Sequence, residues 1–162
     1  MGRYDFIPQA LQRLAARVVF HKVAIRPGKP LLFAVLANGA LYFGLPGNPV
    51  SSAVGLRFFV EPALRNLLGM PAERPLRLPL LADASKKPGF CLLQKAAIVV
   101  DEAGTVGVRL LRGQESFRIE PLLHANGWAV LDAEVSEFPA GTRVDVYPSS
   151  HLDPFLQGTD LP

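Results

Sequence analysis

The sequence predicts an α/β unit over residues 1–72, an all-β unit over residues 73–151 and a tail over residues 152–162. Two observations support this division. The first part mixes helix-like and strand-like segments, whereas the second part consists of short alternating strands separated by Gly-containing turns. Between them, residues 71–79 carry three prolines and little hydrophobic periodicity, so we place the boundary between the units there.

The first predicted element is an amphipathic helix over Ile7–Arg17. Apolar side chains recur there at helical spacing, namely Ile7, Leu11, Leu14 and Val18, and Pro8 suits a first helical turn. Asp5 precedes this helix and has two interpretations, as its N-cap or as a metal ligand.

Three strand-like segments follow, at Val18–Ile25, Leu31–Leu36 and Leu41–Gly44. The last two flank Asn38-Gly39, a pair typical of a hairpin turn. Asn48 and Pro49 then form the usual pairing of an N-cap with a first helical residue, and we expect a helix to about Leu68. Because proline interrupts helical hydrogen bonding, Pro62 predicts a kink or break near Val60.

The second unit is predicted to be a small sandwich or a partly open barrel. Its expected strands are Cys91–Val100, Val106–Leu111, Trp128–Leu131 and Arg143–Tyr147. The elements predicted for the first unit do not make a complete α/β domain, because a parallel sheet needs both of its faces covered. This unit has the content of the second half of an α/β domain.

Charge and composition restrict the partners that we expect. Residues 1–79 carry ten Lys/Arg and three Asp/Glu, whereas residues 80–162 carry seven and eleven, so the first unit favours anions. No basic run with interleaved aromatics indicates nucleic acid, and no stretch has membrane-spanning length. The single cysteine, Cys91, suggests the cytoplasm, and three widely separated histidines make a zinc site improbable.

Two loops carry the strongest functional signal. The first is Lys22-Val-Ala-Ile-Arg26-Pro-Gly-Lys29-Pro30, and the second is Leu45-Pro46-Gly47-Asn48-Pro49-Val50-Ser51-Ser52. Cations on a stiff Pro-Gly turn, beside a helix start with exposed amides and hydroxyls, suit a small oxyanion. The alternatives are a solvated turn and an ordinary capped helix start. Both loops follow predicted strands, which is where α/β folds place ligands.

These blocks resemble the molybdopterin molybdenumtransferases, the family of MoeA and the gephyrin E domain. The resemblance rests on the Lys22–Pro30 block, on Phe43-Gly-Leu-Pro-Gly-Asn-Pro-Val-Ser51 and on Phe59-Val-x-Pro62. It extends through Gln114-x-Ser116 and Ala125-Asn126-Gly127, but only to the C-terminal part of the family's polypeptide. It implies the second half of a three-layer α/β/α molybdopterin-binding domain, followed by a small β-barrel or sandwich domain.

The resemblance also implies an activity, the insertion of molybdate into adenylylated molybdopterin with release of AMP, assisted by Mg²⁺. It implies catalytic roles for Asp5, Lys22 and Arg26, with Asp5 as the metal ligand. The molybdate and pterin-phosphate pocket would be lined by Arg26, Lys29, Pro30, Pro46, Asn48, Pro49, Ser51 and Ser116. The family pattern Arg-x-x-Phe-x-Arg is altered, because this chain has Phe90-Cys-Leu-Leu93-Gln-Lys95 in its place.

Three functional hypotheses follow. In the first, the chain is a C-terminal portion of a molybdenumtransferase, a homodimer in this family, and is inactive by itself. In the second, it is a non-enzymatic oxyanion- or pterin-binding module that needs a separate partner supplying the N-terminal domains. In the third, it is an interaction scaffold that uses apolar surface left exposed on the α/β unit.

Overall fold

The computed structural model describes residues 6–149, so Asp5 and the predicted tail over residues 152–162 lie outside the described part. In chain order the elements are α1 (Ile7–Arg13), β1 (Arg17–His21), β2 (Ile25–Arg26), β3 (Leu32–Val35), β4 (Leu41–Gly44), α2 (Pro49–Gly55), the π-helical turn η1 (Leu56–Val60), α3 (Glu61–Leu67), β5 (Leu76–Pro79), β6 (Ala84–Ser85), β7 (Cys91–Val100), β8 (Val106–Leu110), the 3-10 turn η2 (Glu120–Leu123), β9 (Gly127–Leu131), β10 (Glu137–Phe138) and β11 (Arg143–Pro148). Every helix within this range is too short or too polar to cross a bilayer.

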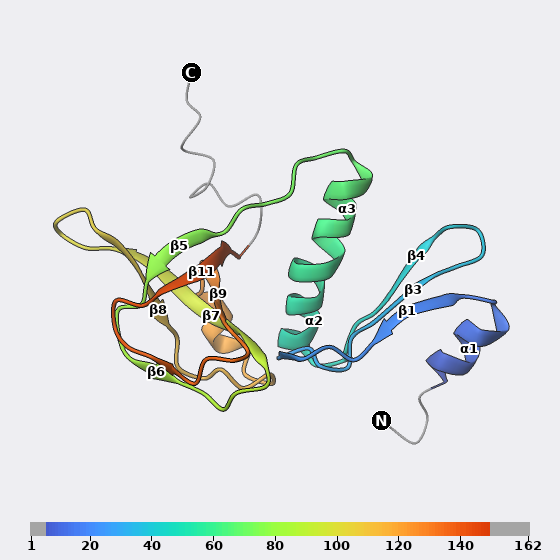
Figure 1. Cartoon of the computed structure of the whole chain (residues 1–162), viewed down its shortest axis with the longest axis horizontal. Helices are drawn as coiled ribbons and strands as arrows, with labels where there is room; N and C mark the ends of the chain where they lie inside the picture. Colours follow the sequence, from blue (N-terminus) through green and yellow to red (C-terminus); the bar gives the residue numbers. More distant parts are fainter. Residues whose placement is uncertain (1–5, 150–162) are drawn as a thin grey trace.

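A three-stranded antiparallel sheet, in the order β1-β3-β4, forms the core of the first part of the chain. The β3–β4 hairpin closes at Asn38-Gly39 as predicted, with Leu36 N–H donating to Ala40 O at 2.8 Å. In Figure 1 this sheet lies on one side of the helix α2–α3, and the β-rich part of the chain lies on the other. The long helix therefore lies between the β1-β3-β4 sheet and the β-rich part.

The first helix is shorter than the predicted Ile7–Arg17. It ends at Arg13, because Ala15 adopts a left-handed conformation with φ 50°. Ala15 N–H donates to Gln12 O and Ala16 N–H donates to Leu11 O, a paired arrangement that commonly closes helices. Of the expected apolar face, only Leu11 is buried, while Ile7, Leu14 and Val18 are exposed.

The predicted long helix forms and contains the expected irregularity. The π-helical turn Leu56–Val60 separates α2 from α3 and ends two residues before Pro62. Proline has no N–H to donate in the helical ladder, and a π turn adjusts the backbone around that missing bond. The helix ends at Leu67, close to the predicted end at about Leu68, and Gly69 follows with φ 68°.

The second sheet has the order β2-β7-β9-β11-β5, with β8 paired to β7. All four predicted strands of this part occur, and the short strands β5, β6 and β10 are additional. Its main core contains the buried side chains of Leu80, Ala96, Ile98, Val108, Ala129, Leu131, Phe138, Val144 and Val146. The edge strand β2 comes from the first part of the chain and runs parallel to β7, pairing Ile25 with Cys91 and Arg26 with Leu92. The two parts thus share one sheet.

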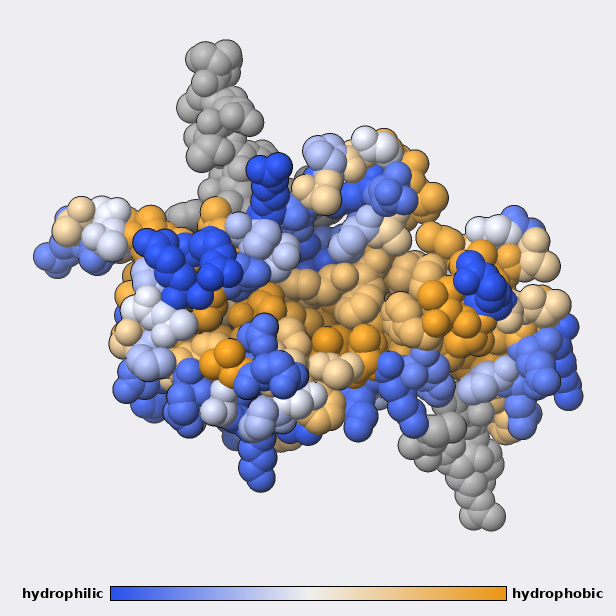
Figure 2. Space-filling view, viewed as in Figure 1, coloured by the Kyte–Doolittle hydropathy of each residue, from blue (hydrophilic) through white to orange (hydrophobic). Residues whose placement is uncertain are grey.

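Exposed apolar side chains gather on the helix and on the first sheet. On α3 and just beyond it, Leu64, Leu67 and Leu68 are 51%, 66% and 74% exposed. Val18 and Val19 on β1 are also exposed. Figure 2 shows apolar residues across the middle of one face, with charged residues mainly around its edges. This much exposed apolar surface is typical of a face that another polypeptide segment covers.

Candidate functional site

The two loops singled out in the sequence face each other across a cleft of about 550 Å³. Its polar lining comes from His21, Lys22 and Lys29, and Pro30 and Pro46 contribute to its wall. The remaining lining residues are Ile7, Pro8, Leu32, Gly44, Leu45 and Gly47. The cleft therefore opens where β1 and β4 end and the helix α2 begins, beside two lysines.

Backbone hydrogen bonds shape the cationic loop. Lys22 N–H donates to Leu31 O at 2.8 Å, and Val23 N–H donates to Lys29 O at 2.9 Å. Lys22 itself has φ 72°, a left-handed conformation that is uncommon outside glycine. Gly28 has φ 109°, and a Cβ there would approach Ile25 Cδ1 at 3.1 Å. This position requires glycine, so the turn holds its cations on a defined frame.

An aromatic ring from the second part of the chain lies against the same loop. The Arg26 guanidinium carbon and Lys29 Nζ each lie 5.2 Å from the centre of the Phe90 ring. Cys91 N–H donates to Ala24 O at 2.9 Å, so the β2–β7 pairing fixes the residue after Phe90 beside the loop. No local pattern of residues indicates this contact, because it depends on pairing between distant segments.

The start of helix α2 has the predicted backbone conformation, but its side chains make other contacts than a helix cap. Asn48 takes the extended N-cap conformation before Pro49, yet its side chain makes no capping hydrogen bond. Asn48 Oδ1 is a buried acceptor with no hydrogen-bond donor among residues 6–149. The Ser52 hydroxyl donates to Pro46 O and so anchors the Pro-Gly loop, while Ser51 is buried.

Ser116 belongs to a loop whose backbone carbonyls accept hydrogen bonds from Lys95. Lys95 is 1% exposed, and its ammonium donates to Gly113 O at 2.6 Å and to Arg118 O at 2.9 Å. Burial lowers the pKa of Lys95, and the nearby Glu115 carboxylate partly opposes this shift. Lys95 is therefore a structural cation inside the β-rich part. It does not line the cleft.

The predicted site residues thus fall into groups. Lys22, Lys29, Pro30 and Pro46 line one cleft, and Arg26 lies beside it on Phe90. Asn48, Pro49, Ser51 and Ser116 do not line it, and Asp5 falls outside the described residues. His21 also lines the cleft but is not among the predicted site residues, because at the level of sequence the spacing of the scattered histidines bears only on a metal site. No group of three or more potential metal ligands occurs within residues 6–149.

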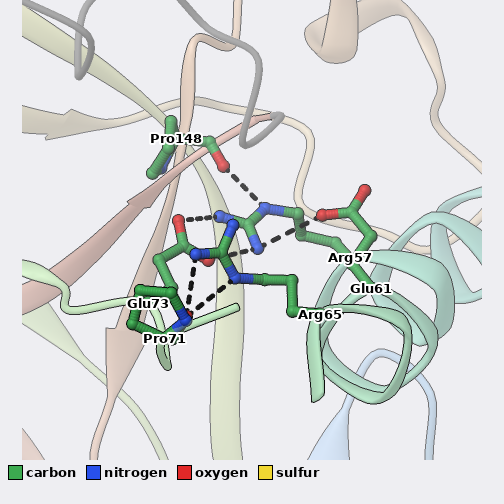
Figure 3. Close-up of polar contacts among 6 residues, drawn as sticks. All are labelled: Arg57, Glu61, Arg65, Pro71, Glu73 and Pro148. Carbon is green, nitrogen blue, oxygen red and sulfur yellow. Dashed lines mark hydrogen bonds and ion pairs between the residues drawn. The ribbon is translucent and has the colours of Figure 1, made fainter. Parts of the chain in front are cut away.

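A second hollow, of about 290 Å³, lies between the end of the helix and the β-rich part. Arg57 is 3% exposed beside it and donates to both Glu73 carboxylate oxygens, at 2.8 and 2.5 Å, and to Pro148 O at 2.9 Å (Figure 3). Arg57 also forms an ion pair with Glu61 at 3.4 Å. These contacts tie the helix, the linker and β11 together.

Two family models match the chain, one to each part. A model described as a probable molybdopterin binding domain matches residues 1–66. A model described as the MoeA C-terminal region (domain IV) matches residues 77–149. The chain belongs to the MoeA family. Within that family it corresponds to a C-terminal portion, and it combines an α/β part with a β part.

Curated relatives carry the name molybdopterin molybdenumtransferase. The protein from Synechococcus elongatus is 38% identical over 147 residues, a match that covers 90% of this chain and 35% of the relative. The Haemophilus influenzae protein is 32% identical over 155 residues, covering 94% and 38%. This MoeA-family chain therefore spans little more than a third of the length of these relatives.

Solved structures agree on the fold. A molybdopterin biosynthesis MoeA protein from Pyrococcus horikoshii superposes with a TM-score of 0.68 at 24% identity, over 90% of this chain and 35% of that one. A molybdenum cofactor biosynthesis protein from Pyrococcus furiosus gives a TM-score of 0.66 at 23% identity, over 89% and 54%.

Proposed function

We propose that this chain supplies the C-terminal part of the site at which molybdate is inserted into adenylylated molybdopterin during molybdenum cofactor biosynthesis. The observation that carries the proposal is the cleft with Lys22 and Lys29, in the part of the chain that matches a molybdopterin-binding model. No described carboxylate forms an ion pair with Arg26, Lys22 or Lys29. Their charge is therefore available to an anionic small molecule.

The proposed chemistry is electrostatic. Lys22 and Lys29 would bind molybdate or the pterin phosphate, and Arg26, with its planar fork of donors, would grip two oxygens at once. Cations held on a rigid turn stabilise the charge that develops as a phosphate bond breaks, at little cost of reorganisation. Pro30 and Pro46 would form the wall of the site, and Asn48, Pro49, Ser51 and Ser116 would complete it from the helix start and the β part.

Mg²⁺ enters this proposal only through Asp5. Residues 6–149 contain no cluster of carboxylates, histidines or cysteines that would hold the ion by themselves. The described residues therefore do not fit a magnesium site, and no step of the proposed chemistry is routed through the metal.

Further features of the family are also proposals for this chain. The first part would form half of a three-layer α/β/α domain ending near residue 72, and residues 73–151 would form a barrel or sandwich. The exposed apolar side chains of α3 and β1 support a covering segment, supplied by further N-terminal domains or by a separate partner. A homodimer and a cytoplasmic location would follow from the family, and the isolated chain would be inactive.

A second candidate function is a non-enzymatic module that binds an oxyanion or a pterin and pairs with a separate N-terminal chain. The same apolar surface favours it, and it would serve equally as the contact face of an interaction scaffold. Co-purification from the native cells separates these readings. A separate partner chain that carries the family's N-terminal domains would support the module, whereas a longer single polypeptide would support the enzyme.

The binding site is tested by titrating the chain with tungstate or molybdate. We expect Arg26→Ala and Lys29→Ala each to weaken binding at least tenfold, about 1.4 kcal/mol. Arg109→Ala removes an exposed cation on β8, far from the cleft lining, and should leave the titration unchanged. Unchanged curves for both loop variants would rule out this site.

A further inference from the structure

We infer that Phe90 is a positioning residue of the anion site. Its ring holds the side chains of Arg26 and Lys29 in place and leaves their positive charges unneutralised. This inference rests on the proposed function and deepens it. It assigns part of the site's organisation to a β-part residue at a position where the family pattern has arginine.

The geometry of the contact is the first step of the argument. Both cations lie 5.2 Å from the same ring centre, within the distance of about 6 Å at which a ring face attracts a positive charge. Arg26 and Lys29 are only three residues apart and repel each other. A neutral ring that attracts both offsets this repulsion while the total charge stays at two.

The chemical identity of the holding group is the second step. A carboxylate in the place of Phe90 would also hold the cations, but it would compete directly with an incoming oxyanion. No described carboxylate forms an ion pair with either cation. An aromatic ring restricts long, flexible side chains and leaves their N–H donors free for a ligand.

The rigidity of the ring's own support is the third step. Phe90 follows Gly89, whose N–H donates to Ala133 O at 2.9 Å, and precedes Cys91, whose N–H donates to Ala24 O at 2.9 Å. Both neighbours are therefore held by the backbone, one within the β part and one at the cationic loop. The ring is fixed relative to the cations by main-chain pairing and does not depend on the cations for its position.

The test measures tungstate affinity of the whole chain by calorimetry, in a series of substitutions at one position. We expect Phe90→Leu and Phe90→Met to weaken tungstate binding three- to tenfold, because two exposed cation–ring contacts are lost. Phe90→Tyr and Phe90→Trp keep a ring face and should stay within twofold of the wild type. In a Lys29→Ala background, Phe90→Leu should have a smaller effect, since one of its two contacts is already absent.

A matched control and a stability readout separate positioning from a merely structural role. Phe43→Leu makes the same chemical change at a ring stacked 4.7 Å from Phe33, and it should leave tungstate affinity unchanged. A merely structural role would lower the unfolding midpoint of Phe90→Leu and leave its affinity within twofold of the wild type. If Phe90→Leu binds tungstate within twofold of the wild type while Lys29→Ala binds it tenfold more weakly, the inference is overturned and the proposed function stands. Equal binding by the wild type and Lys29→Ala, or no binding by either, would overturn both.

Discussion

Replacing Arg57 by alanine should remove a large part of the chain's folding stability. The Arg57 side chain is 4% exposed, and it supplies both donors to the Glu73 carboxylate, which is itself 16% exposed. It also supplies a donor to Pro148 O, and its guanidinium lies 5.7 Å from the ring centres of both Phe58 and Tyr147. Alanine leaves a partly buried carboxylate and a buried carbonyl without these donors, and it creates a cavity.

The expected magnitude follows from these losses. Removing one partner of a buried ion pair costs about 3–5 kcal/mol, mostly because the remaining charge is left desolvated. A domain is typically stable by about 5–15 kcal/mol in total. With a urea dependence of about 2 kcal/mol per molar, the unfolding midpoint should fall by about 2 M.

The assay is equilibrium unfolding in urea followed by the fluorescence of Trp128. This is the single tryptophan of the chain, it is 3% exposed, and its ring centre lies 6.4 Å from that of Phe58, the neighbour of Arg57. Arg77→Ala is the matched control, because Arg77 pairs with Asp145 at 3.0 Å while its own side chain is 63% exposed. An exposed pair of this kind contributes at most about 1 kcal/mol. If Arg57→Ala and Arg77→Ala lower the midpoint equally, the buried cluster does not stabilise the chain as argued.

Three further predictions concern single positions. Gly28→Ala should destabilise the chain by about 1–3 kcal/mol, more than Gly39→Ala, where a Cβ meets nothing within 4 Å; equal unfolding midpoints would contradict this. Burial and the Asp132 carboxylate raise the pKa of Cys91. Alkylation of Cys91 by iodoacetamide at pH 8 should therefore be slower in the native than in the urea-unfolded chain. A native alkylation rate that levels off below about pH 8.5 would refute the raised pKa. Lys95→Met should cost about 1–3 kcal/mol, because loop carbonyls lose their donor. Since folding lowers the pKa of Lys95, the unfolded chain binds that proton more tightly, and wild-type stability relative to Lys95→Met should rise with pH toward 10.5 in thermal unfolding.

Local sequence patterns predicted most of the helices and strands. The predictions failed where the residue type does not indicate the backbone conformation that the chain adopts. The β3–β4 hairpin and the π turn before Pro62 followed from Asn38-Gly39 and from proline chemistry. The end of α1 was missed because Ala15 adopts a left-handed conformation that usually belongs to glycine. The predicted strand Val18–Ile25 was wrong as a single element: it divides into β1, which ends at His21, and the separate strand β2 (Ile25–Arg26). Local periodicity does not indicate this division, because the partners of β2 lie more than sixty positions away.

The candidate site was predictable to the extent that it is built from contiguous loops. Lys22, Lys29, Pro30 and Pro46 were expected together and line one cleft. Phe90 could not be expected there, because only the pairing of β2 with β7 brings it to the cations. The resemblance places Lys95 at an arginine position of the family pattern, whereas in the structure Lys95 is buried and donates to loop carbonyls.

The parallel pairing of β2 with β7 has a practical consequence for anyone who would dissect the chain. A truncation at the linker, near Pro71, would strip the start of β7 of its neighbour and leave Cys91 and Leu92 on a bare strand edge. Bare edges recruit other chains, so the isolated β part should be prone to aggregate. The severed cationic loop would in turn lose the ring beneath its charges. A soluble preparation is therefore best sought with the linker intact and both parts expressed as one polypeptide.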